Sequence, residues 1–431
     1  MKVLWFTNDP LPAVHYHLGR TPSGSGTWMP CLLEELKRTP GVQVEVAASS
    51  PGLRDAQYTI DGTDYFVLSQ PRFQPFFWGT KRDLQKAACL VRERRPDVIH
   101  IHGTERYYGL LAARGLVSTP CVISLQGLLG SCLQGFFGAL SPRDVWRSDR
   151  LSEVATRRGL MWSYWDFQTA ARREREILMG VKAFMGRTDW DRSQLYSVNP
   201  GARYFHAGEI LRRDFKNHAW DLLKCDRHTV IFTNAGEPRR GIEVLLDALK
   251  LLKRDFPDAR LRLAGGIGNR RGYHRFFRRT IEESGASGSV DFLGYMDGGE
   301  MAAELSRAHV FATASYVENS PNSLCEAMQV GLPCVASYTG GIPSLVQHGE
   351  TGLMFPMGDA PLLADSIARI FRSDELAAHL GDNARIEATS RHAPPKVASQ
   401  TLAAYNEVAN GAERPYAGRP EERVAVLEQS N

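Results

Sequence analysis

The sequence lacks a hydrophobic run long enough to cross a membrane. No stretch of its 431 residues approaches the roughly 20 apolar residues of a spanning helix. The apolar start over residues 1–9 is broken by polar residues and is too short for the core of a signal peptide. We therefore expect a cytoplasmic protein, with no membrane association beyond a peripheral contact at the inner face.

Cysteine pairs and an excess of charge of one sign are also missing. The seven cysteines are scattered without a Cys-x-x-Cys spacing, which favours free thiols in a reducing compartment. No His and Cys residues have the spacing of a zinc site, and we expect neither a metal nor a cofactor. The formal net charge of +4 is too small to indicate a nucleic-acid partner.

The chain is long enough for two hydrophobic cores, and its composition is that of a globular protein, with 43% hydrophobic and 23% charged residues. Short apolar runs alternate with amphipathic stretches in both halves, which predicts βαβ units and parallel sheets. A turn signal at 199–201 and a polar stretch at 216–227 mark the boundary between the halves. We predict an α/β fold with Rossmann-like domains at residues 1–205 and 206–394, and a frayed, flexible tail at 411–431.

Periodicity predicts the individual elements. Strands are expected at 3–7, 42–48, 65–67, 98–101, 122–125, 181–186, 230–233, 260–264, 290–293, 310–314 and 334–337. Helices are expected at 28–37, 83–94, 108–116, 152–179, 242–252, 273–283 and 318–330.

The most informative motif is Glu318-Asn-Ser-Pro-Asn-Ser-Leu-Cys-Glu326. Ser320 suits an N-cap and Pro321 the first helical position. The helix that follows offers free N–H groups and a positive dipole end to an anion, with a carboxylate on either side. Two solvated acids at a helix end are the alternative interpretation. The neighbouring Gly340-Gly341 loop favours a binding site for a ligand with a phosphate and hydroxyl groups.

The Glu-x7-Glu spacing resembles the signature of the retaining glycosyltransferases of family 4, which have the GT-B architecture of two Rossmann-like domains facing each other across a cleft. The resemblance continues at residues 290–295, 308–315 and 349–353. It implies that Glu326 binds the ribose of a nucleotide and that Glu318 lies near the reacting carbon of the donor sugar. It also implies that the helix start at Ser320 and the amides of Asn322, Ser323 and Leu324 hold the distal phosphate. In this architecture the last helix, expected at 395–410, crosses back to the N-terminal domain.

A turn at 236–241, between a strand and a helix, contains Arg239 and Arg240. Fixed cations there would stabilise the charge that develops on a departing diphosphate. Arg240 stands where the family usually has lysine, and Arg239 substitutes for an upstream basic position near Glu237. Solvated arginines on an exposed turn are the alternative.

Loops of the first half supply further candidates for the cleft. Gly24 and Gly26 precede a helix and would let a phosphate or an acceptor approach the backbone, although a plain turn explains them equally well. His102 and Glu105 follow a strand at the edge where open α/β sheets bind ligands, whereas His100 is expected to be structural.

Gln126 follows the next strand, where many family members have a histidine that contacts the donor sugar. Because glutamine takes up no proton near neutral pH, it would position the sugar. Asp189-Trp-Asp191 resembles the metal-binding Asp-x-Asp motif of a different glycosyltransferase fold, but here it is expected to cap and start a helix without metal. Arg187 beside it is a candidate for the acceptor side.

Aromatic and basic residues alternate between 135 and 180, including Trp146 and Trp165. One interpretation is that these residues dock on an anionic membrane or on a lipid-linked acceptor. The other, which we expect, is that the aromatic side chains fill the core and the arginines form a solvent-exposed helix face.

The sequence thus predicts a retaining, metal-independent glycosyltransferase of the hexosyl type, active in polysaccharide or glycoconjugate biosynthesis. Its donor would be a UDP, GDP or ADP sugar and its acceptor a carbohydrate or a lipid-linked hydroxyl. The alternatives are a sugar-phosphate synthase or phosphorylase on the same fold, and a catalytically inactive nucleotide-binding protein.

Overall fold

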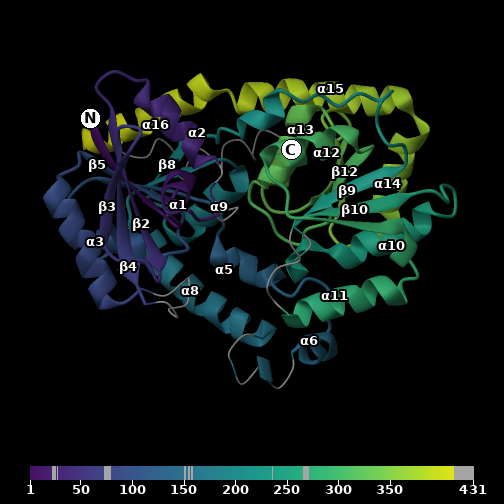
Figure 1. The fold of residues 1–431 in the computed structure, drawn as a ribbon, viewed down its shortest axis with the longest axis horizontal. Coiled ribbons are helices and arrows are strands. Elements are labelled where there is room, and N and C mark those ends of the chain that lie inside the picture. Colours follow the sequence, from purple (N-terminus) through teal and green to yellow (C-terminus); the bar gives the residue numbers. More distant parts are fainter. Residues whose placement is uncertain are drawn as a thin grey trace, which may run out of the picture.

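Two α/β domains stand side by side, each built on its own sheet (Figure 1). The computed structural model describes residues 1–21, 26, 28–71, 79–149, 152–153, 156, 159–234, 236–265 and 271–411. The predicted tail therefore lies outside the described residues beyond position 411, as does Gly24. The predicted fold class of two Rossmann-like sheets is confirmed.

The N-terminal sheet has the order β3-β4-β2-β1-β5-β6-β7-β8. Its pairs are parallel except for β3 with β4, which is antiparallel. The strands are β1 (Lys2–Thr7), β2 (Gln43–Pro51), β3 (Ala56–Ile60), β4 (Thr63–Gln70), β5 (Val98–His102), β6 (Cys121–Ser124), β7 (Ala183–Gly186) and β8 (Arg203–His206).

The C-terminal sheet has the order β11-β10-β9-β12-β13-β14, with all its pairs parallel. The strands are β9 (Thr229–Thr233), β10 (Arg260–Ala264), β11 (Val290–Gly294), β12 (Val310–Thr313), β13 (Cys334–Tyr338) and β14 (Leu353–Pro356).

Helices cover both faces of each sheet, which explains the apolar strands. In β1, Leu4 and Phe6 enter one hydrophobic core while Val3 and Trp5 enter the core on the opposite face. The N-terminal helices are α1 (Pro12–His17), α2 (Met29–Lys37), α3 (Lys81–Arg94), α4 (Leu110–Ala113), α5 (Leu129–Cys132), α6 (Pro142–Ser148), α8 (Leu160–Gly180) and α9 (Asp189–Val198). The C-terminal helices are α10 (Ile242–Leu252), α11 (Arg271–Glu283), α12 (Gly298–Arg307), α13 (Asn322–Val330), α14 (Ala360–Arg372) and α15 (Asp374–Arg391).

The last helix, α16 (Pro394–Ala409), returns to the N-terminal sheet. Figure 1 shows α15 and α16 running along the top of both domains. α16 packs against α2 and strands β5, β6 and β8. The Tyr405 hydroxyl accepts a hydrogen bond from Trp5 Nε1 at 3.0 Å and lies 2.6 Å from His100 Nδ1. The domain limits at 205 and 394 stay a prediction.

Most predicted elements are present, with three differences. The helix expected at 108–116 is a 3-10 turn, Tyr107–Gly109, followed by the single turn α4. The helix ends early because Gly115, two residues after α4, has a left-handed φ of +63°, a conformation that terminates helices. The helix expected from 152 is observed as α8 from Leu160. Ser320 is not an N-cap, because α13 begins at Asn322 with an extended Pro321 before it and no side-chain cap.

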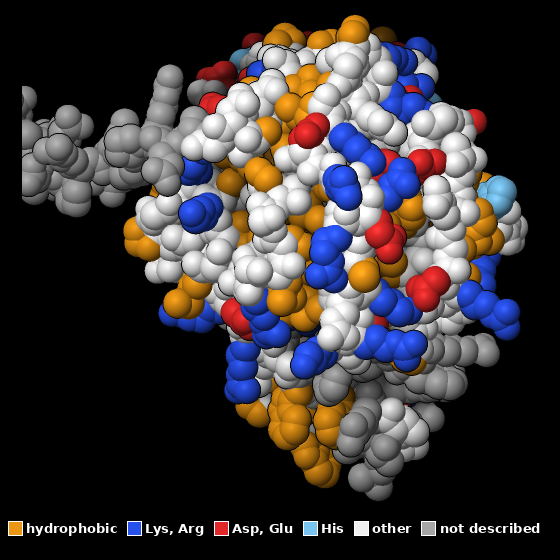
Figure 2. Space-filling model, turned by 90° about the vertical axis from the view of Figure 1, so that its left-hand side faces the viewer, with side chains coloured by type: hydrophobic (Ala, Val, Ile, Leu, Met, Phe, Trp, Pro, Cys, Tyr) orange, Lys and Arg blue, Asp and Glu red, His pale blue; other side chains and the backbone are white. Residues whose placement is uncertain are grey.

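The aromatic residues between 135 and 180 divide between core and surface. Phe136 packs with Tyr164 and Phe167 in a small cluster, as expected. Trp146 on α6 and Trp165 on α8 are instead 82% and 55% exposed, so the expectation that the aromatics fill the core is wrong for these two. Figure 2 shows hydrophobic side chains projecting at the lower end of the molecule, beneath a band of Lys and Arg.

Candidate functional site

A cavity of about 750 Å³ lies between the two domains and is lined from both. Its walls come from the carboxyl ends of strands in the two sheets, where open α/β sheets bind ligands. Among the predicted residues it brings together His102, Glu105, Gln126, Arg187, Arg239, Arg240, Glu318, Ser320, Asn322, Ser323, Glu326 and Gly26. Leu324 is fully buried instead, and its N–H donates to the Pro321 carbonyl at 3.0 Å.

The first turn of α13 faces this cavity. The N–H groups of Asn322 and Ser323 have no acceptor within the described part of the chain, whereas those of Leu324 and Cys325 both bond to the Pro321 carbonyl. Two free amides at a helix N-terminus suit the oxygens of an anion.

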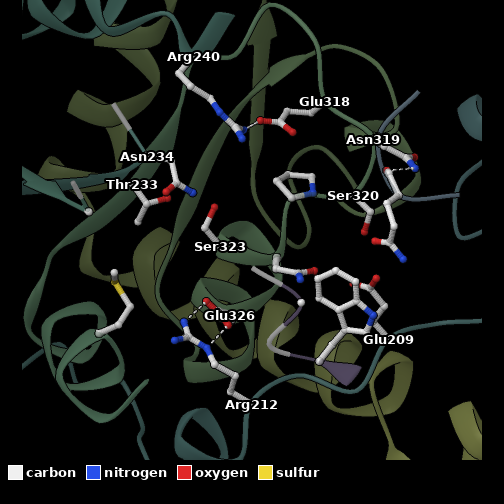
Figure 3. Close-up of a pocket in the computed structure, with 18 of the residues that line it drawn as sticks. Glu209, Arg212, Thr233, Asn234, Arg240, Glu318, Asn319, Ser320, Ser323 and Glu326 are labelled. Atoms are coloured by element: carbon white, nitrogen blue, oxygen red, sulfur yellow. Dashed lines mark hydrogen bonds and ion pairs between the residues drawn. The ribbon is translucent and has the colours of Figure 1, made fainter. Parts of the chain in front are cut away.

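Glu318 pairs with Arg240 at one end of that turn (Figure 3). Its Oε1 also accepts a hydrogen bond from the Ser315 hydroxyl at 3.1 Å. Burial and the neighbouring Arg239 lower the pKa of Arg240 to about 10, which leaves it charged at neutral pH. Arg239 is held by Glu237, with Nε and Oε2 2.7 Å apart. The two arginines therefore lie on the cavity wall as fixed cations.

The Gly340-Gly341 loop holds Glu318 in place. The Gly341 N–H donates to the Glu318 carbonyl at 2.9 Å. Gly340 has a φ of +52°, and a β-carbon there would collide with the same carbonyl oxygen. Glycine is needed at this position both for its left-handed backbone and for the close approach.

Glu326 pairs with Arg212 at the other end of the turn. The guanidinium donates twice, from Nε to Oε1 and from Nη2 to Oε2, each at 2.8 Å. Burial raises the pKa of Glu326 against the opposing effect of Arg212. A carboxylate has about four lone-pair positions, so two remain for hydroxyl donors. Arg212 was not predicted, because it lies 114 positions upstream of Glu326 in the interdomain segment and no local pattern marks it.

Buried polar groups of the N-terminal domain form the opposite wall. Neither ring nitrogen of His102 has a hydrogen-bond partner among the described residues, and burial lowers its pKa to about 3. Glu105 accepts hydrogen bonds from Asn8 Nδ2 at 3.0 Å and from the Gly127 N–H at 3.2 Å. His100 is structural as predicted, with Nε2 2.6 Å from the Ser124 hydroxyl.

Gln126 and Arg187 are joined on this wall. Arg187 Nη2 lies 3.3 Å from Gln126 Oε1 and 3.2 Å from the Leu125 carbonyl, and its Nη1 pairs with Glu209. Glu209 was not predicted and follows strand β8, which was also missed. Strand β8 is only four residues long, with Arg203, Tyr204 and Phe205 half-buried and His206 exposed, so no buried apolar run marks the strand or the Glu209 that follows it.

Asn319 connects the two walls. Its Nδ2 donates to the Gln126 carbonyl at 2.9 Å and to Asp191 Oδ2 at 3.2 Å, and its Oδ1 accepts from the Thr188 hydroxyl at 2.7 Å. The predicted helix start at Asp189 is confirmed, but the capping side chain is Thr188, which accepts from the Asp191 N–H. Asp191 also accepts from the Tyr204 hydroxyl at 2.7 Å. The second aspartate of the Asp-x-Asp sequence is thus a structural partner of protein donors.

Two family models match adjoining parts of the chain. The "Glycosyl transferase 4-like domain" matches residues 23–203, and "Glycosyl transferases group 1" matches residues 214–387. Both halves of the cavity therefore come from glycosyltransferase domains. The chain belongs to the GT-B glycosyltransferases of the family 4 type.

Curated relatives of this glycosyltransferase match part of it. A phosphatidyl-myo-inositol mannosyltransferase from Mycobacterium leprae is 34% identical over 183 residues, which are 42% of this chain and 47% of the relative. A D-inositol 3-phosphate glycosyltransferase from Corynebacterium efficiens is 32% identical over 181 residues, 41% of this chain and 42% of the relative. The chain thus spans less than half the length of these relatives.

Solved structures of the same fold cover the chain almost completely. Sucrose-phosphate synthase from Thermosynechococcus elongatus has a TM-score of 0.72 at 19% identity, covering 96% of this chain and all of that one. Anabaena HepE, solved with UDP-glucose, has a TM-score of 0.66 at 16% identity, covering 95% of this chain and all of that one. Within the described residues of this glycosyltransferase, no helix has the length and apolarity that a membrane span requires.

Proposed function

We propose that the protein transfers a sugar from a nucleotide diphosphate to an acceptor hydroxyl, with retention at the anomeric carbon and without a metal, in polysaccharide or glycoconjugate biosynthesis. The observation that carries this proposal is the pair of carboxylate–arginine contacts, Glu318–Arg240 and Glu326–Arg212, at the two ends of one helix N-terminus. In Figure 3 these pairs are drawn above and below Ser323. A nucleotide diphosphate sugar has hydroxyls at both ends and phosphates between them.

In the proposed donor site, Glu326 accepts hydrogen bonds from the ribose hydroxyls. The N–H groups of Asn322 and Ser323 bind the distal phosphate, with Ser320 beside them. Arg239 and Arg240 stabilise the diphosphate as its charge develops, which supports a reaction without metal. The position of Arg239 and Arg240 on the cavity wall supports this role.

The proposed transfer occurs on one face of the sugar. The bond between the anomeric carbon and the diphosphate oxygen breaks, and its electron pair leaves with the diphosphate. The acceptor oxygen bonds to the anomeric carbon on the same face, and its proton passes to the departing phosphate oxygen. Glu318 lies against the sugar, and Gln126 and His102 position the reacting groups, with Glu105 and Arg187 on the acceptor side.

The relatives suggest which donors to test first. HepE is solved with UDP-glucose, and one relative from Mycobacterium tuberculosis is named a GDP-mannose-dependent mannosyltransferase. When UDP, GDP and ADP sugars are tested in turn, the sugars of one of the three nucleotides should raise the unfolding temperature of the protein. Product analysis with and without EDTA then tests transfer, metal independence and the anomeric outcome. Tight nucleotide binding without hydrolysis or transfer of any sugar would contradict the proposal.

We also propose a cytoplasmic location with peripheral membrane contact through the exposed aromatics of α6 and α8. Trp146 and Trp165 are exposed apolar side chains, and exposed arginines lie on the same helices, Arg147 on α6 and Arg172 on α8, as on membrane-contacting surfaces. Co-sedimentation with anionic vesicles, lost in Trp146→Ala/Trp165→Ala, is the expected result. Equal sedimentation of both proteins would contradict it.

A further inference from the structure

Among the described residues, the N-terminal wall of the cavity has one positively charged side chain, Arg187. Strands β1, β5, β6, β7 and β8 are neighbours in the sheet, and the segment after each contributes to this wall. The charged, titratable and amide side chains on this wall are Asn8, Asp9, His102, Glu105, Gln126, Arg187 and Glu209. Three are carboxylic acids and one is a guanidinium.

That guanidinium is already engaged. Arg187 Nη1 pairs with Glu209, and Nη2 lies within hydrogen-bond distance of the Leu125 carbonyl and Gln126 Oε1. The side chain is 8% exposed, so it has little freedom to reach a new partner. The remaining arginines of the lining, Arg212, Arg239 and Arg240, belong to the proposed donor side.

The unpaired groups of this wall suit hydroxyls. A neutral His102 presents one donor and one acceptor, and neither has a partner among the described residues. The Gln126 side-chain oxygen already accepts from Arg187, but its NH2 group offers two further donors. A hydroxyl both donates and accepts, whereas a phosphate accepts and requires several donors or cations.

From this asymmetry we infer that the acceptor is an uncharged carbohydrate or polyol terminus, and that the N-terminal wall selects against an acceptor with a phosphate near the reacting hydroxyl. The inference rests on the proposed function and specifies its acceptor. A lipid-linked glycan is compatible with this inference when a neutral sugar separates its phosphate from the reacting hydroxyl. A sugar phosphate is not, because its charge would lie among Asp9, Glu105 and Glu209.

A binding experiment tests the inference without turnover. The protein is saturated with whichever of UDP, GDP or ADP stabilises it most, and glucose 6-phosphate or inositol 3-phosphate is added to millimolar concentration. We expect no rise in unfolding temperature beyond that of the nucleotide. A saturable rise that Arg187→Gln removes would overturn the inference. Absence of stabilisation by every nucleotide would instead count against the proposed function.

A charge variant sharpens the test. Glu209→Gln releases Arg187 and removes a negative charge, so binding of the two sugar phosphates should strengthen at least tenfold. Glu407→Gln is the matched control, since it removes an exposed ion pair with Arg203 outside the cavity. Equal, unchanged binding in both variants would overturn the inference. In transfer assays with the wild-type protein, glucose and inositol should exceed their phosphates at least tenfold in kcat/KM, and a preference for the phosphates would overturn it.

Discussion

Replacing Arg212 by methionine should destabilise the protein and weaken nucleotide binding together. Glu326 is 5% exposed, and its two oxygens each accept one hydrogen bond from Arg212. Methionine preserves apolar volume but leaves a buried carboxylate without its cation. Breaking a fully buried pair costs about 3–5 kcal/mol, and because the Arg212 side chain is 22% exposed we expect roughly 2–3 kcal/mol.

The charge state of Glu326 explains the effect on binding. Without Arg212, burial and the neighbouring Asp214 act on the carboxyl unopposed, so its pKa should rise further above its ordinary range. A protonated carboxyl retains fewer acceptor positions for ribose hydroxyls. We therefore expect nucleotide affinity to fall at least tenfold, measured by calorimetry, with the deficit smaller at higher pH, where the carboxylate returns.

Arg213→Met is the matched control for this prediction. Arg213 is the neighbouring residue, and its side chain is 60% exposed and paired with a half-exposed Glu34. Such a surface pair contributes about 0–1 kcal/mol. The double variant Arg212→Met/Glu326→Gln should recover stability relative to Arg212→Met, because no buried charge is left. Equal unfolding temperatures and affinities for Arg212→Met and Arg213→Met would refute the reasoning.

Three further predictions follow from the same structure. Burial raises the pKa of Glu174 to about 7, so the folded protein favours the neutral acid. The free energy of unfolding should therefore fall as the pH rises from the pKa of Glu174 in the unfolded chain toward 7. In denaturant unfolding between pH 5 and 8, the wild type should lose up to roughly 3 kcal/mol of stability relative to Glu174→Gln. Gly340→Ala should cost more stability than Gly349→Ala and should slow transfer. Both glycines have a positive φ, but a β-carbon would meet a carbonyl oxygen at position 340 and open space at position 349. Equal unfolding temperatures for the two variants would contradict this. Asn319→Ala should cost about 2 kcal/mol and increase protease sensitivity between the domains. Asn383→Ala should do neither, since Asn383 is half-buried and its hydrogen bond to the Glu350 carbonyl is exposed to solvent.

The sequence predicts the fold well where a residue's environment follows from its neighbours along the chain. Helix α10 has its predicted limits, Ile242 and Leu252, because its apolar face is continuous and Gly241 precedes it with the left-handed φ of +68°. Strand β8 has four residues, none of them fully buried, and lies at the edge of its sheet, so no continuous buried run marks it in the sequence.

The candidate site divides in the same way. Glu318, Arg240 and Glu326 were identified from local motifs, and all three line one cavity. Their partners were not predictable, because Glu318–Arg240 and Glu326–Arg212 join residues distant in sequence. The dual contacts of Asn319 depend on the relative placement of two domains, which no local pattern encodes.

The return of α16 to the N-terminal sheet determines how this protein can be divided. A fragment ending after β8 would lack Tyr405, which contacts both Trp5 and His100 in its core. It would also leave uncovered the apolar side chains that Val397 and Ala404 pack against. Chimeras that exchange N-terminal domains between related proteins therefore need two junctions, one in the interdomain segment and one before Pro394. The same chain path makes residues 394–409, supplied as a separate peptide, a natural partner for complementing a truncated N-terminal domain.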